Sequence, residues 1–211
     1  MNAKLIVAID GPAAAGKGTL ARRLAAALSL PYLDTGLLYR AVARRLLNAG
    51  EDPADPGAAT ATAETLAPAD LERTDLRTPE VDLAAAAVAS LPGVRAALLA
   101  FQRQFGQANG AVLDGRDIGT VIFPDAPVKI FVTASVAARA ERRFKELRAR
   151  GVEVTLRDVT DDLEARDAQD AARAAAPLRQ ADDAVRLDTT DLGPDAAFAR
   201  AMEIVGNATR K

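Results

Sequence analysis

One short segment near the start of the chain carries residue types suited to binding phosphate. It contains the G-x-x-x-x-G-K pattern of a P-loop. Glycines let backbone N–H groups curl around phosphate oxygens, and the helix that follows adds the partial positive charge of its N-terminus. Lys17 is expected to bridge the β- and γ-phosphates of ATP. The pattern therefore predicts a nucleotide-binding loop made by Gly11, Pro12, Ala13, Ala14, Ala15, Gly16, Lys17, Gly18 and Thr19.

The hydroxyl residue of this loop is displaced from its usual position, in which a Ser or Thr directly follows the lysine and binds Mg²⁺. Here Gly18 follows the lysine and Thr19 comes one place later. Thr19 could bind the metal directly or through water. A second candidate is Asp114, which follows the apolar run Ala111–Leu113, because ligands gather at the C-terminal ends of parallel strands. We interpret Asp114 as a partner of the metal or its water; the alternative is that it only caps the next turn.

The residue types that are missing narrow the chemistry further. The chain has no Cys and no His, which excludes disulfides, thiolate nucleophiles, imidazole bases and the usual zinc sites. Carboxylates, Lys, Arg and backbone N–H groups remain. Phosphoryl transfer needs little else, because it depends on positioning and on charge neutralisation.

Length and charge predict one domain that acts on small molecules. With 211 residues and 49% hydrophobic content, the chain can bury a core but is short for two independent domains. A formal charge of -2 provides no global positive field for a nucleic-acid polymer. The apolar run Leu5–Ile9 is short for a signal peptide, and no stretch reaches the roughly 20 apolar residues of a membrane helix. We therefore expect a soluble, cytoplasmic monomer with no membrane or nucleic-acid partner.

Apolar periodicity predicts strands that alternate with helices. The run Leu5–Ile9 is typical of a central parallel strand, and Leu20, Leu24 and Leu28 mark one face of the helix after it. Residues 51–70 are interpreted as a surface excursion or short helices with long loops. Alternation of this kind predicts an α/β fold with a parallel sheet and helices on both faces. Further strands are expected at 31–34, 111–113, 128–132 and 184–187, and further helices at about 38–49, 81–105, 136–150, 158–173 and from 194.

Three further groups of residues join the phosphate loop in a pattern that extends along nearly the whole chain. They are Leu33-Asp34-Thr35-Gly36 with Tyr39-Arg40; Asp114-Gly-Arg116-Asp117-Ile-Gly-Thr120 with Phe123-Pro-Asp-Ala-Pro127; and Arg166-Asp167 with Asp170, Arg173 and Pro177-Leu178. Many kinases share the phosphate loop, whereas the last two groups, in this order and spacing, are far more specific. Together the four groups resemble the cytidylate kinase family, the bacterial (d)CMP kinases among the P-loop nucleoside monophosphate kinases.

The resemblance implies a five-stranded parallel core, a monophosphate-binding insertion over about 35–110 and a lid over about 142–175. It also implies a role for individual side chains toward the acceptor and the nucleotide phosphates. Family members have a base-contacting Ser where this chain has Ala86, so one expected hydrogen bond is missing. The implied partners are Thr35, Tyr39, Arg40 and Arg116 for the acceptor and its phosphate, Arg95 and Asp117 for the cytosine edge, Arg166 and Asp170 for the sugar, and Arg142 and Arg173 for the nucleotide phosphates.

Spacing along the expected helices supports part of this assignment. Arg166, Asp170 and Arg173 fall at i, i+4 and i+7, so they share one helix face. An exposed i, i+4 salt bridge would explain the first two without any ligand. Arg139, Arg142 and Arg143 likewise share a polar side, opposite the apolar stripe that includes Val136, and on most helices such a side is simply solvated.

We therefore expect transfer of the γ-phosphoryl group of ATP, with Mg²⁺, to CMP and dCMP, catalysed by Lys17, Arg116, Arg142 and Arg173. No strong base is needed, because the attacking phosphate oxygen is already ionised near neutral pH. The nearest alternative is a P-loop kinase for UMP, AMP or another small acceptor such as shikimate. A nucleotide-dependent switch of the GTPase type is a second alternative, but the sequence has no Asn-Lys-x-Asp guanine motif.

Overall fold

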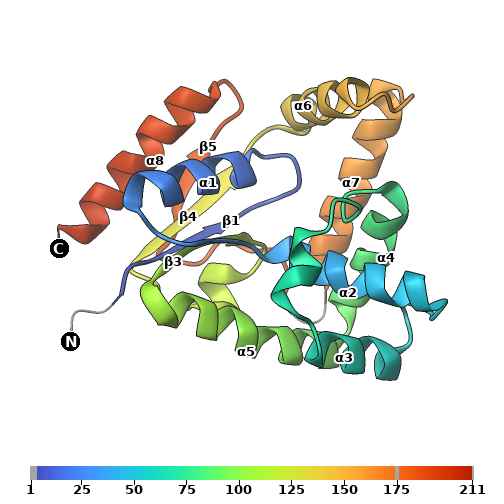
Figure 1. Ribbon diagram of the computed structural model, residues 1–211. Coiled ribbons are helices and arrows are strands. Elements are labelled where there is room, and N and C mark those ends of the chain that lie inside the picture. Colours follow the sequence, from blue (N-terminus) through green and yellow to red (C-terminus); the bar gives the residue numbers. More distant parts are fainter. Residues whose placement is uncertain (1–3, 174–175, 211) are drawn as a thin grey trace. The chain divides into compact units, whose positions relative to one another are not determined.

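The computed structural model describes residues 4–173 and 176–210 (Figure 1), so residues 174 and 175 of the expected lid lie outside the described residues. The chain divides into two compact units. The first, called the P-loop unit below, comprises Met1–Leu33 and Asn109–Lys211. The second, called the helical unit, comprises Asp34–Ala108.

A five-stranded sheet with the order β2-β3-β1-β4-β5 forms the centre of the fold. The pairings of β1 with β3, β1 with β4 and β4 with β5 are parallel, and Ile9 aligns with Asp114 on one side and with Ile130 on the other. The predicted α/β fold with a parallel sheet is therefore confirmed. The strands are β1 (Ile6–Asp10), β2 (Tyr32–Asp34), β3 (Ala111–Gly115), β4 (Val128–Thr133) and β5 (Val185–Asp188).

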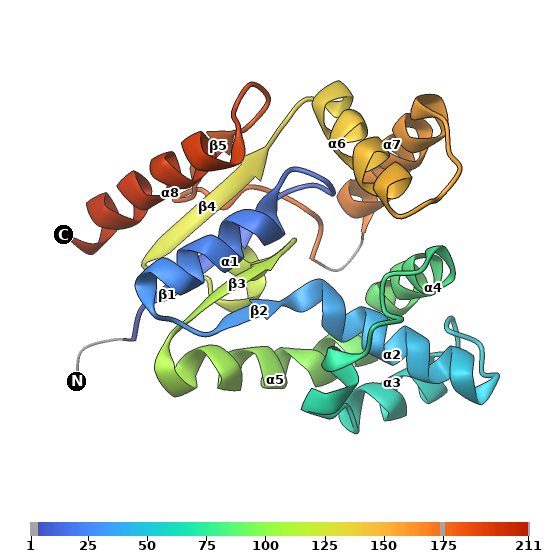
Figure 2. The same cartoon turned by 45° about the horizontal axis from the view of Figure 1, so that its top comes forward.

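Two helices of the P-loop unit cover one face of this sheet. Helices α1 (Lys17–Leu28) and α8 (Pro194–Thr209) pack on each other, α1 also packs on β1 and β3, and α8 on β4 and β5 (Figures 1 and 2). The predicted stripe of α1 is buried through Leu20 and Leu24, which pack with Val7, Ile9 and other buried residues of the sheet. Because β1 carries the phosphate loop at its C-terminal end, this packing fixes the direction in which the loop leaves the sheet.

The short helix η2 (Ile118–Ile122) packs on β1 and β3, and the carboxylate of Asp10 holds its start. Asp10 accepts hydrogen bonds from the backbone N–H groups of Ile118 and Gly119, both at 2.8 Å. Burial raises the pKa of Asp10 from 3.8 to about 6, although these two hydrogen bonds act in the opposite direction. The last residue of β1 thus fixes the backbone that follows Asp117.

Helices α6 (Val136–Ala149) and α7 (Leu156–Ala172) form a hairpin with a small core of its own. Buried Ala140, Val159 and Leu163 make this core, and the P-loop residues Ala13 and Ala14 pack against it. Both helix starts are capped by hydroxyl side chains, because Ser135 accepts from Ala138 N and Thr155 accepts from Asp158 N. The hairpin therefore contacts the phosphate loop from within the same unit.

The helical unit is built on helix α2, whose buried side chains include Leu38, Val42 and Leu46, as the apolar spacing predicted. Helix α2 packs on α4 and α3, and it ends at Gly50, which has the left-handed φ of 72° that favours glycine. The predicted excursion at 51–70 contains two short helices. The elements are α2 (Thr35–Ala49), α3 (Pro56–Glu64), η1 (Pro68–Glu72), α4 (Pro79–Ser90) and α5 (Pro92–Asn109).

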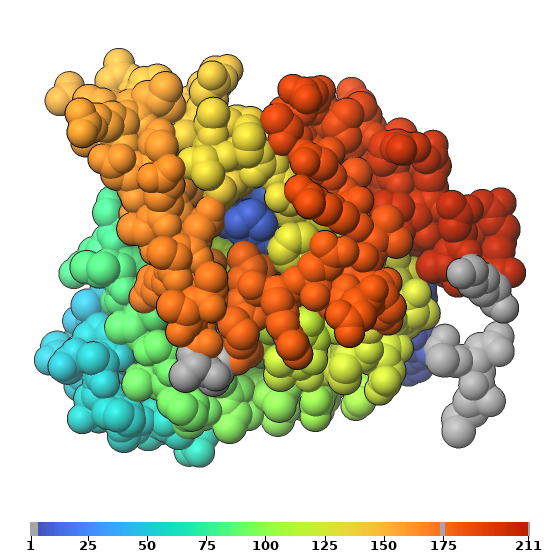
Figure 3. Space-filling model, turned by 180° about the vertical axis from the view of Figure 1, so that it is seen from behind, coloured from blue at the N-terminus to red at the C-terminus, as the bar shows by residue number. Residues whose placement is uncertain are grey.

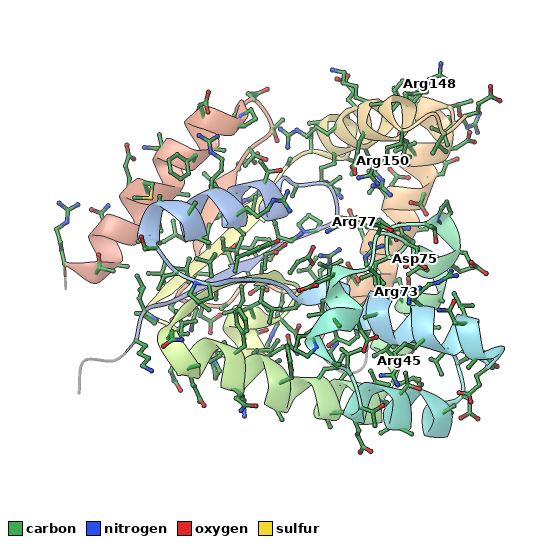
Figure 4. All side chains as sticks on the ribbon, in the orientation of Figure 1. Arg45, Arg73, Asp75, Arg77, Arg148 and Arg150 are labelled. Carbon is green, nitrogen blue, oxygen red and sulfur yellow. The ribbon has the colours of Figure 1, made fainter. Side chains whose placement is uncertain are left out.

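Several ion pairs of the helical unit lie at its surface. Figure 4 labels Arg45, Arg73, Asp75 and Arg77 there, and the guanidinium of Arg73 donates two hydrogen bonds to Asp75, at 2.9 and 2.7 Å. This hydrogen bonding lowers the pKa of Asp75. Exposed pairs of this kind contribute little to stability, and we assign them no part in the site below.

Among the described residues, no single helix is long and apolar enough to cross a membrane. Helices α4 and α5 meet the requirement of length and composition only when they are taken together, and they are bent by 94° at the break between them. Each has a buried face, through Val81 and Val88 in α4 and Val94 and Leu98 in α5.

The raised pKa of Asp10 predicts a specific dependence of stability on pH. A carboxyl group that binds its proton more tightly in the folded state loses stability for the fold as pH rises from its unfolded to its folded pKa. Between pH 4.5 and 7 the ionisation of Asp10 should therefore cost about 2 kcal/mol, from pKa values of 3.8 and about 6. The measurement is the free energy of unfolding of the wild-type protein minus that of Asp10→Asn, across this range.

Asp10→Asn also changes the hydrogen bonds to Ile118 and Gly119. That effect does not depend on pH, so it adds only a constant to the difference between the two free energies of unfolding. Titrating groups that do not interact with Asp10 cancel between the two proteins, and Lys17, whose pKa the charge of Asp10 raises, titrates only at the upper end of this range. A difference that stays constant, or that grows in favour of the wild type as pH rises, would contradict the raised pKa.

Candidate active site

The carbonyl groups of the phosphate loop are anchored by three side chains of the P-loop unit. Lys17 Nζ donates to the carbonyl of Pro12 at 2.7 Å, and Thr189 Oγ1 donates to that of Ala15 at 3.1 Å. Arg139 Nη1 donates to the carbonyl of Ala13 at 3.3 Å. Such anchoring turns the carbonyl groups toward the protein, which is the arrangement in which loop N–H groups can face an anion.

Gly11 is required where the loop begins. A Cβ atom at Gly11 would lie 1.9 Å from the carbonyl oxygen of Val132 on β4, and its φ of 146° is outside the range that other residues favour. The loop backbone can therefore approach the next strand only because this residue has no side chain.

Lys17 is a buried cation whose environment weakens its hold on a proton. Its side chain lies in the first turn of α1, and the residue is 6% exposed. Burial, followed by the nearby positive charge of Arg116, lowers the pKa of Lys17 to about 7, while the charges of Asp114, Asp10 and Asp170 act in the opposite direction. Burial is thus the main reason why the ammonium charge is costly at this position, and an anionic ligand would offset that cost.

A single buried carboxylate pairs with two arginines next to this lysine. Asp170 on α7 accepts a hydrogen bond from Arg116 Nε at 2.6 Å through Oδ2, and its Oδ1 lies 2.7 Å from Arg173 Nη2. Asp170 is 5% exposed. The Nε atom of Arg173 is buried and has no hydrogen-bond partner among the described residues. Arg116, Asp170 and Arg173 are therefore brought together, and the pair of arginines retains donor capacity for another anion.

Arg166, on the same helix as Asp170, forms a salt bridge with another carboxylate. Its Nε atom lies 3.1 Å from Asp162, one helical turn earlier, and both side chains are partly exposed. The i, i+4 pair that the spacing allowed as a simpler explanation was Arg166 with Asp170, so the observed pair is a different one. Asp117, next to Arg116, is 5% exposed, and its charge contributes to the raised pKa of Asp10.

Asp114 lies at the C-terminal end of β3 and is oriented by an aromatic residue of the neighbouring strand. Tyr32 Oη donates to Asp114 Oδ1 at 2.7 Å. Gly18 lies opposite, because a Cβ atom there would be 4.0 Å from Asp114 Oδ2. Thr19, one residue later on α1, is exposed and lines a cavity elsewhere.

That cavity, of about 370 Å³, lies beside the phosphate loop within the P-loop unit. The loop residues Ala14, Ala15, Gly16 and Thr19 contribute to one wall, and Leu192 and Pro194 to another. Arg142 also lines it, and its guanidinium donates to Thr189 Oγ1 at 3.0 Å and to the Thr189 carbonyl. Figure 3 shows a hollow between yellow and orange segments of the same unit, with blue residues of the N-terminal segment at its floor.

The remaining expected substrate residues belong to the helical unit. Tyr39 and Arg40 lie on α2, and Arg95 on α5 places its guanidinium over the ring of Tyr39, at 5.8 Å from the ring centre. Arg40 forms a salt bridge with buried Asp82 and donates to the carbonyl of Leu76 at 3.3 Å. Thr35 is buried in the first turn of α2, and Ala86 lies on α4.

Comparison with known proteins decides the family. A family model described as cytidylate kinase matches residues 7–207. Proteins named cytidylate kinase from Acidiphilium cryptum (strain JF-5) and Granulibacter bethesdensis (strain ATCC BAA-1260 / CGDNIH1) are each 62% identical to this chain, over 205 and 202 residues. These matches cover 97% of both chains for the first and 96% of this chain and 97% of the relative for the second. The chain belongs to the cytidylate kinase family.

Membership makes this protein a nucleoside monophosphate kinase, a phosphotransferase, as the four groups of residues predicted. A solved structure of an uncharacterized protein from Eubacterium ventriosum ATCC 27560 is also similar in fold. Its TM-score is 0.55 at 13% identity, and the match covers 99% of this chain and all of that chain. At this identity the similarity concerns the fold alone.

The sequence did not reveal a buried ion pair that supports the site of this cytidylate kinase family member. Arg139 is 3% exposed rather than solvated, and it donates two hydrogen bonds to Asp167 on α7, at 3.1 and 2.6 Å. Arg139 also donates to the carbonyl of Ala134 at 3.1 Å. One guanidinium thus joins α6, α7 and the phosphate loop. The only signal in the sequence was the Arg166-Asp167 motif, which does not say which partner Asp167 has.

The lowered pKa of Lys17 predicts how the enzyme responds to alkaline pH. Above about pH 7 the free enzyme loses the ammonium charge, whereas bound ATP phosphates favour the charged form and raise the pKa. The value of kcat/KM for ATP, which reports the free enzyme, should therefore fall about tenfold per pH unit between pH 7.5 and 9. The value of kcat, which reports the bound enzyme, should change much less over this range.

Lys17→Arg is the matched control, because a guanidinium stays charged throughout this range. Its activity is expected to be lower, but its kcat/KM for ATP should lose the alkaline decline. The same slope in both proteins would assign the ionisation to another group.

Proposed function

We propose that this member of the cytidylate kinase family transfers the γ-phosphoryl group of ATP to CMP and to dCMP. One observation carries the proposal beyond the family match: Lys17, Arg116 and Arg173 form a partly buried cationic cluster of the P-loop unit, and Asp170 pairs with both arginines. Three such cations are costly to hold without anions. Nucleotide phosphates are the anions that a P-loop binds.

We place the triphosphate of ATP along the loop Gly11 to Thr19 and its nucleoside part in the adjacent cavity. A volume of about 370 Å³ lies in the range of small-molecule sites. The apolar side chains of Leu192 and Pro194 suit a purine ring, and Arg142 lies beside the loop at the same cavity. Arg142 and Arg173, carried by the α6–α7 hairpin and its end, are then the lid residues that approach the phosphates.

The residues near the loop fit a Mg²⁺ ion that is held mainly by phosphates and water. The described part of the chain contains no group of three or more His, Cys, Asp or Glu residues that could hold a metal alone. Mg²⁺ commonly needs only one or two carboxylates when a nucleotide supplies the other ligands. Asp114 supplies one such carboxylate. A bound ion would neutralise part of the negative charge of the phosphates.

We assign the acceptor to the residues that the family resemblance implies. Tyr39, Arg40 and Arg116 would bind its phosphate, with Thr35 as a further contact, and Arg95 and Asp117 would bind the cytosine edge. Arg166 and Asp170 would bind the sugar. Two of these guanidinium groups are already paired with carboxylates, Arg40 with Asp82 and Arg116 with Asp170, so an incoming phosphate would join or replace an internal anion.

In this mechanism an oxygen of the monophosphate attacks the γ-phosphorus while the bond to the β-γ bridging oxygen breaks. The attacking oxygen is ionised near neutral pH, so no side chain has to remove a proton. Lys17, Arg116 and Arg173 neutralise the charge on the transferred group. Closure of the α6–α7 hairpin over the nucleotide would exclude water and so prevent hydrolysis of ATP.

The proposed function predicts which monophosphates the enzyme accepts. With ATP and Mg²⁺, CMP and dCMP should both be converted to their diphosphates, whereas AMP and UMP should react far more slowly. A coupled assay of ADP formation across all ribo- and deoxyribonucleoside monophosphates measures this. Lys17→Met, expected to lower kcat by on the order of a hundredfold or more, serves as a control for contaminating kinases.

Inert CMP and dCMP beside a reactive AMP or UMP would overturn the substrate assignment. A basal ATP hydrolysis that no monophosphate accelerates would instead favour the nucleotide-dependent switch.

A further prediction concerns Asp117 and the choice between cytosine and uracil. Cytosine has an exocyclic amino donor where uracil has a carbonyl acceptor, so a carboxylate is attracted to one and repelled by the other. Asp117→Asn keeps the shape but adds a donor that can serve uracil. The ratio of kcat/KM for CMP to that for UMP should fall at least about tenfold, equivalent to about 1.4 kcal/mol.

Arg95→Lys is the companion variant, because it retains a donor for the base and the positive charge. An unchanged ratio in Asp117→Asn, in a protein that folds and binds ATP normally, would assign recognition of the base to other residues.

A further inference from the structure

The hydroxyl group that a P-loop normally supplies is absent from its usual position in this chain. In the usual form, a Ser or Thr directly after the lysine places its hydroxyl on Mg²⁺, near the acidic residue at the end of a neighbouring strand. Gly18 occupies that position here. Thr19, the next hydroxyl residue, is exposed and lines the cavity that Leu192 and Pro194 also line.

Another hydroxyl lies next to the empty space at Gly18. A Cβ atom at Gly18 would lie 3.7 Å from Tyr32 Oη and 4.0 Å from Asp114 Oδ2. The same phenol donates to Asp114 Oδ1 at 2.7 Å. A hydroxyl, the acidic residue and the first turn of the P-loop helix are thus grouped together, with the hydroxyl supplied by β2 instead of α1.

The phenol is held in place by more than its bond to Asp114. The guanidinium of Arg22 lies over the ring of Tyr32, 5.9 Å from the ring centre. The backbone next to Tyr32 is also held: the carbonyl of Pro31 accepts a hydrogen bond from Val112 N at 2.9 Å, which joins the start of β2 to β3. The strand pairing and the stacked cation therefore fix the hydroxyl relative to the carboxylate.

We propose that Tyr32 is a positioning residue of the metal site, and that its phenol takes over the role of the hydroxyl missing at Gly18. The hydrogen bond fixes Asp114 Oδ1, so that Oδ2 is the oxygen presented toward the first turn of α1. Outer partners that orient a metal-binding carboxylate commonly affect metal affinity as strongly as some direct ligands. The inference rests on the proposed role of Asp114 at the Mg²⁺ site.

The test measures how much Mg²⁺ strengthens the binding of ADP. Isothermal titration gives the Kd of ADP in EDTA and in excess Mg²⁺, and their ratio reports the metal's contribution without catalysis. Tyr32→Phe removes only the hydroxyl and should lower this ratio about tenfold, the lower end of outer-partner effects, because phosphates and water provide most of the ligands. The Kd in EDTA should change less than about twofold.

Restoring a hydroxyl from the other side distinguishes this role from simple packing of the ring. The space at Gly18 is at ordinary contact distance from its neighbours, so a serine can be accommodated there. Tyr32→Phe with Gly18→Ser should recover most of the ratio, whereas Tyr32→Phe with Gly18→Ala, its matched control, should not. Equal ratios in these two double variants would overturn the proposal.

Two further proteins complete the test. Gly18→Ser alone should change the ratio less than about twofold, because Tyr32 already holds Asp114; a gain above fivefold would overturn the proposal even if the Phe variants did not fold.

Asp114→Asn separates the role of Tyr32 from the role of Asp114 at the metal site. If it lowers the ratio but Tyr32→Phe does not, the role of Tyr32 is wrong and the metal assignment stands. If Asp114→Asn leaves the ratio unchanged, the metal assignment itself fails.

Discussion

Cations that are to bind phosphates must be held close together before the phosphates arrive, and this constraint organises the P-loop unit. Lys17 is buried and its pKa is lowered to about 7, which measures how unfavourable an additional charge is at this point. The arginines beside it are neutralised by carboxylates from α7: Asp170 pairs with Arg116 and Arg173, and Asp167 pairs with Arg139. Removing one partner of such a buried pair leaves an uncompensated charge, which is far more costly than never burying the pair. Helix α7 therefore does more than cover the site, because its carboxylates make the unliganded arrangement of arginines possible.

The same contacts determine the shape of the phosphate loop. Its carbonyl groups are bound by Lys17, Arg139 and Thr189, which come from α1, α6 and the segment after β5. At the opposite end, Asp10 binds the backbone at the start of η2, next to Asp117. A change in the hairpin is thus transmitted to the loop through Arg139, and a change at the end of β1 is transmitted to the segment that carries Arg116. The strand ends and the two carboxylates of α7 act as one support for the nucleotide.

Much of this could be predicted from the sequence, and the reasons for the exceptions are physical. The loop, the strand before it and the acidic residue at the end of β3 follow from local patterns, since a buried strand and a glycine-rich turn require particular residues at neighbouring positions. Pairings between distant residues do not follow in this way: Arg116 and Asp170 are 54 positions apart, and Tyr32 and Asp114 are 82 apart. Periodicity places Arg139 on a polar face of α6 but cannot show that α7 and the loop cover that face. Tyr32, within a short strand, has the signature of a packing residue because its hydroxyl finds a partner only once β2 lies beside β3.

Asp170 has more candidate partners than its one carboxylate can serve. Its carboxylate pairs with two arginines, although the family resemblance gives it a contact with the sugar. One carboxylate cannot bind both guanidinium groups and a sugar hydroxyl equally well. A phosphate with two negative charges attracts Arg116 and Arg173 more strongly than one carboxylate does, so its arrival would free Asp170 to accept from the sugar. Without a phosphate the internal pair is retained and the cationic cluster stays partly neutralised. Charge exchange of this kind would couple the release of Asp170 to the binding of substrate, and the role that we propose for Arg116 and Arg173 would then depend on a bound acceptor.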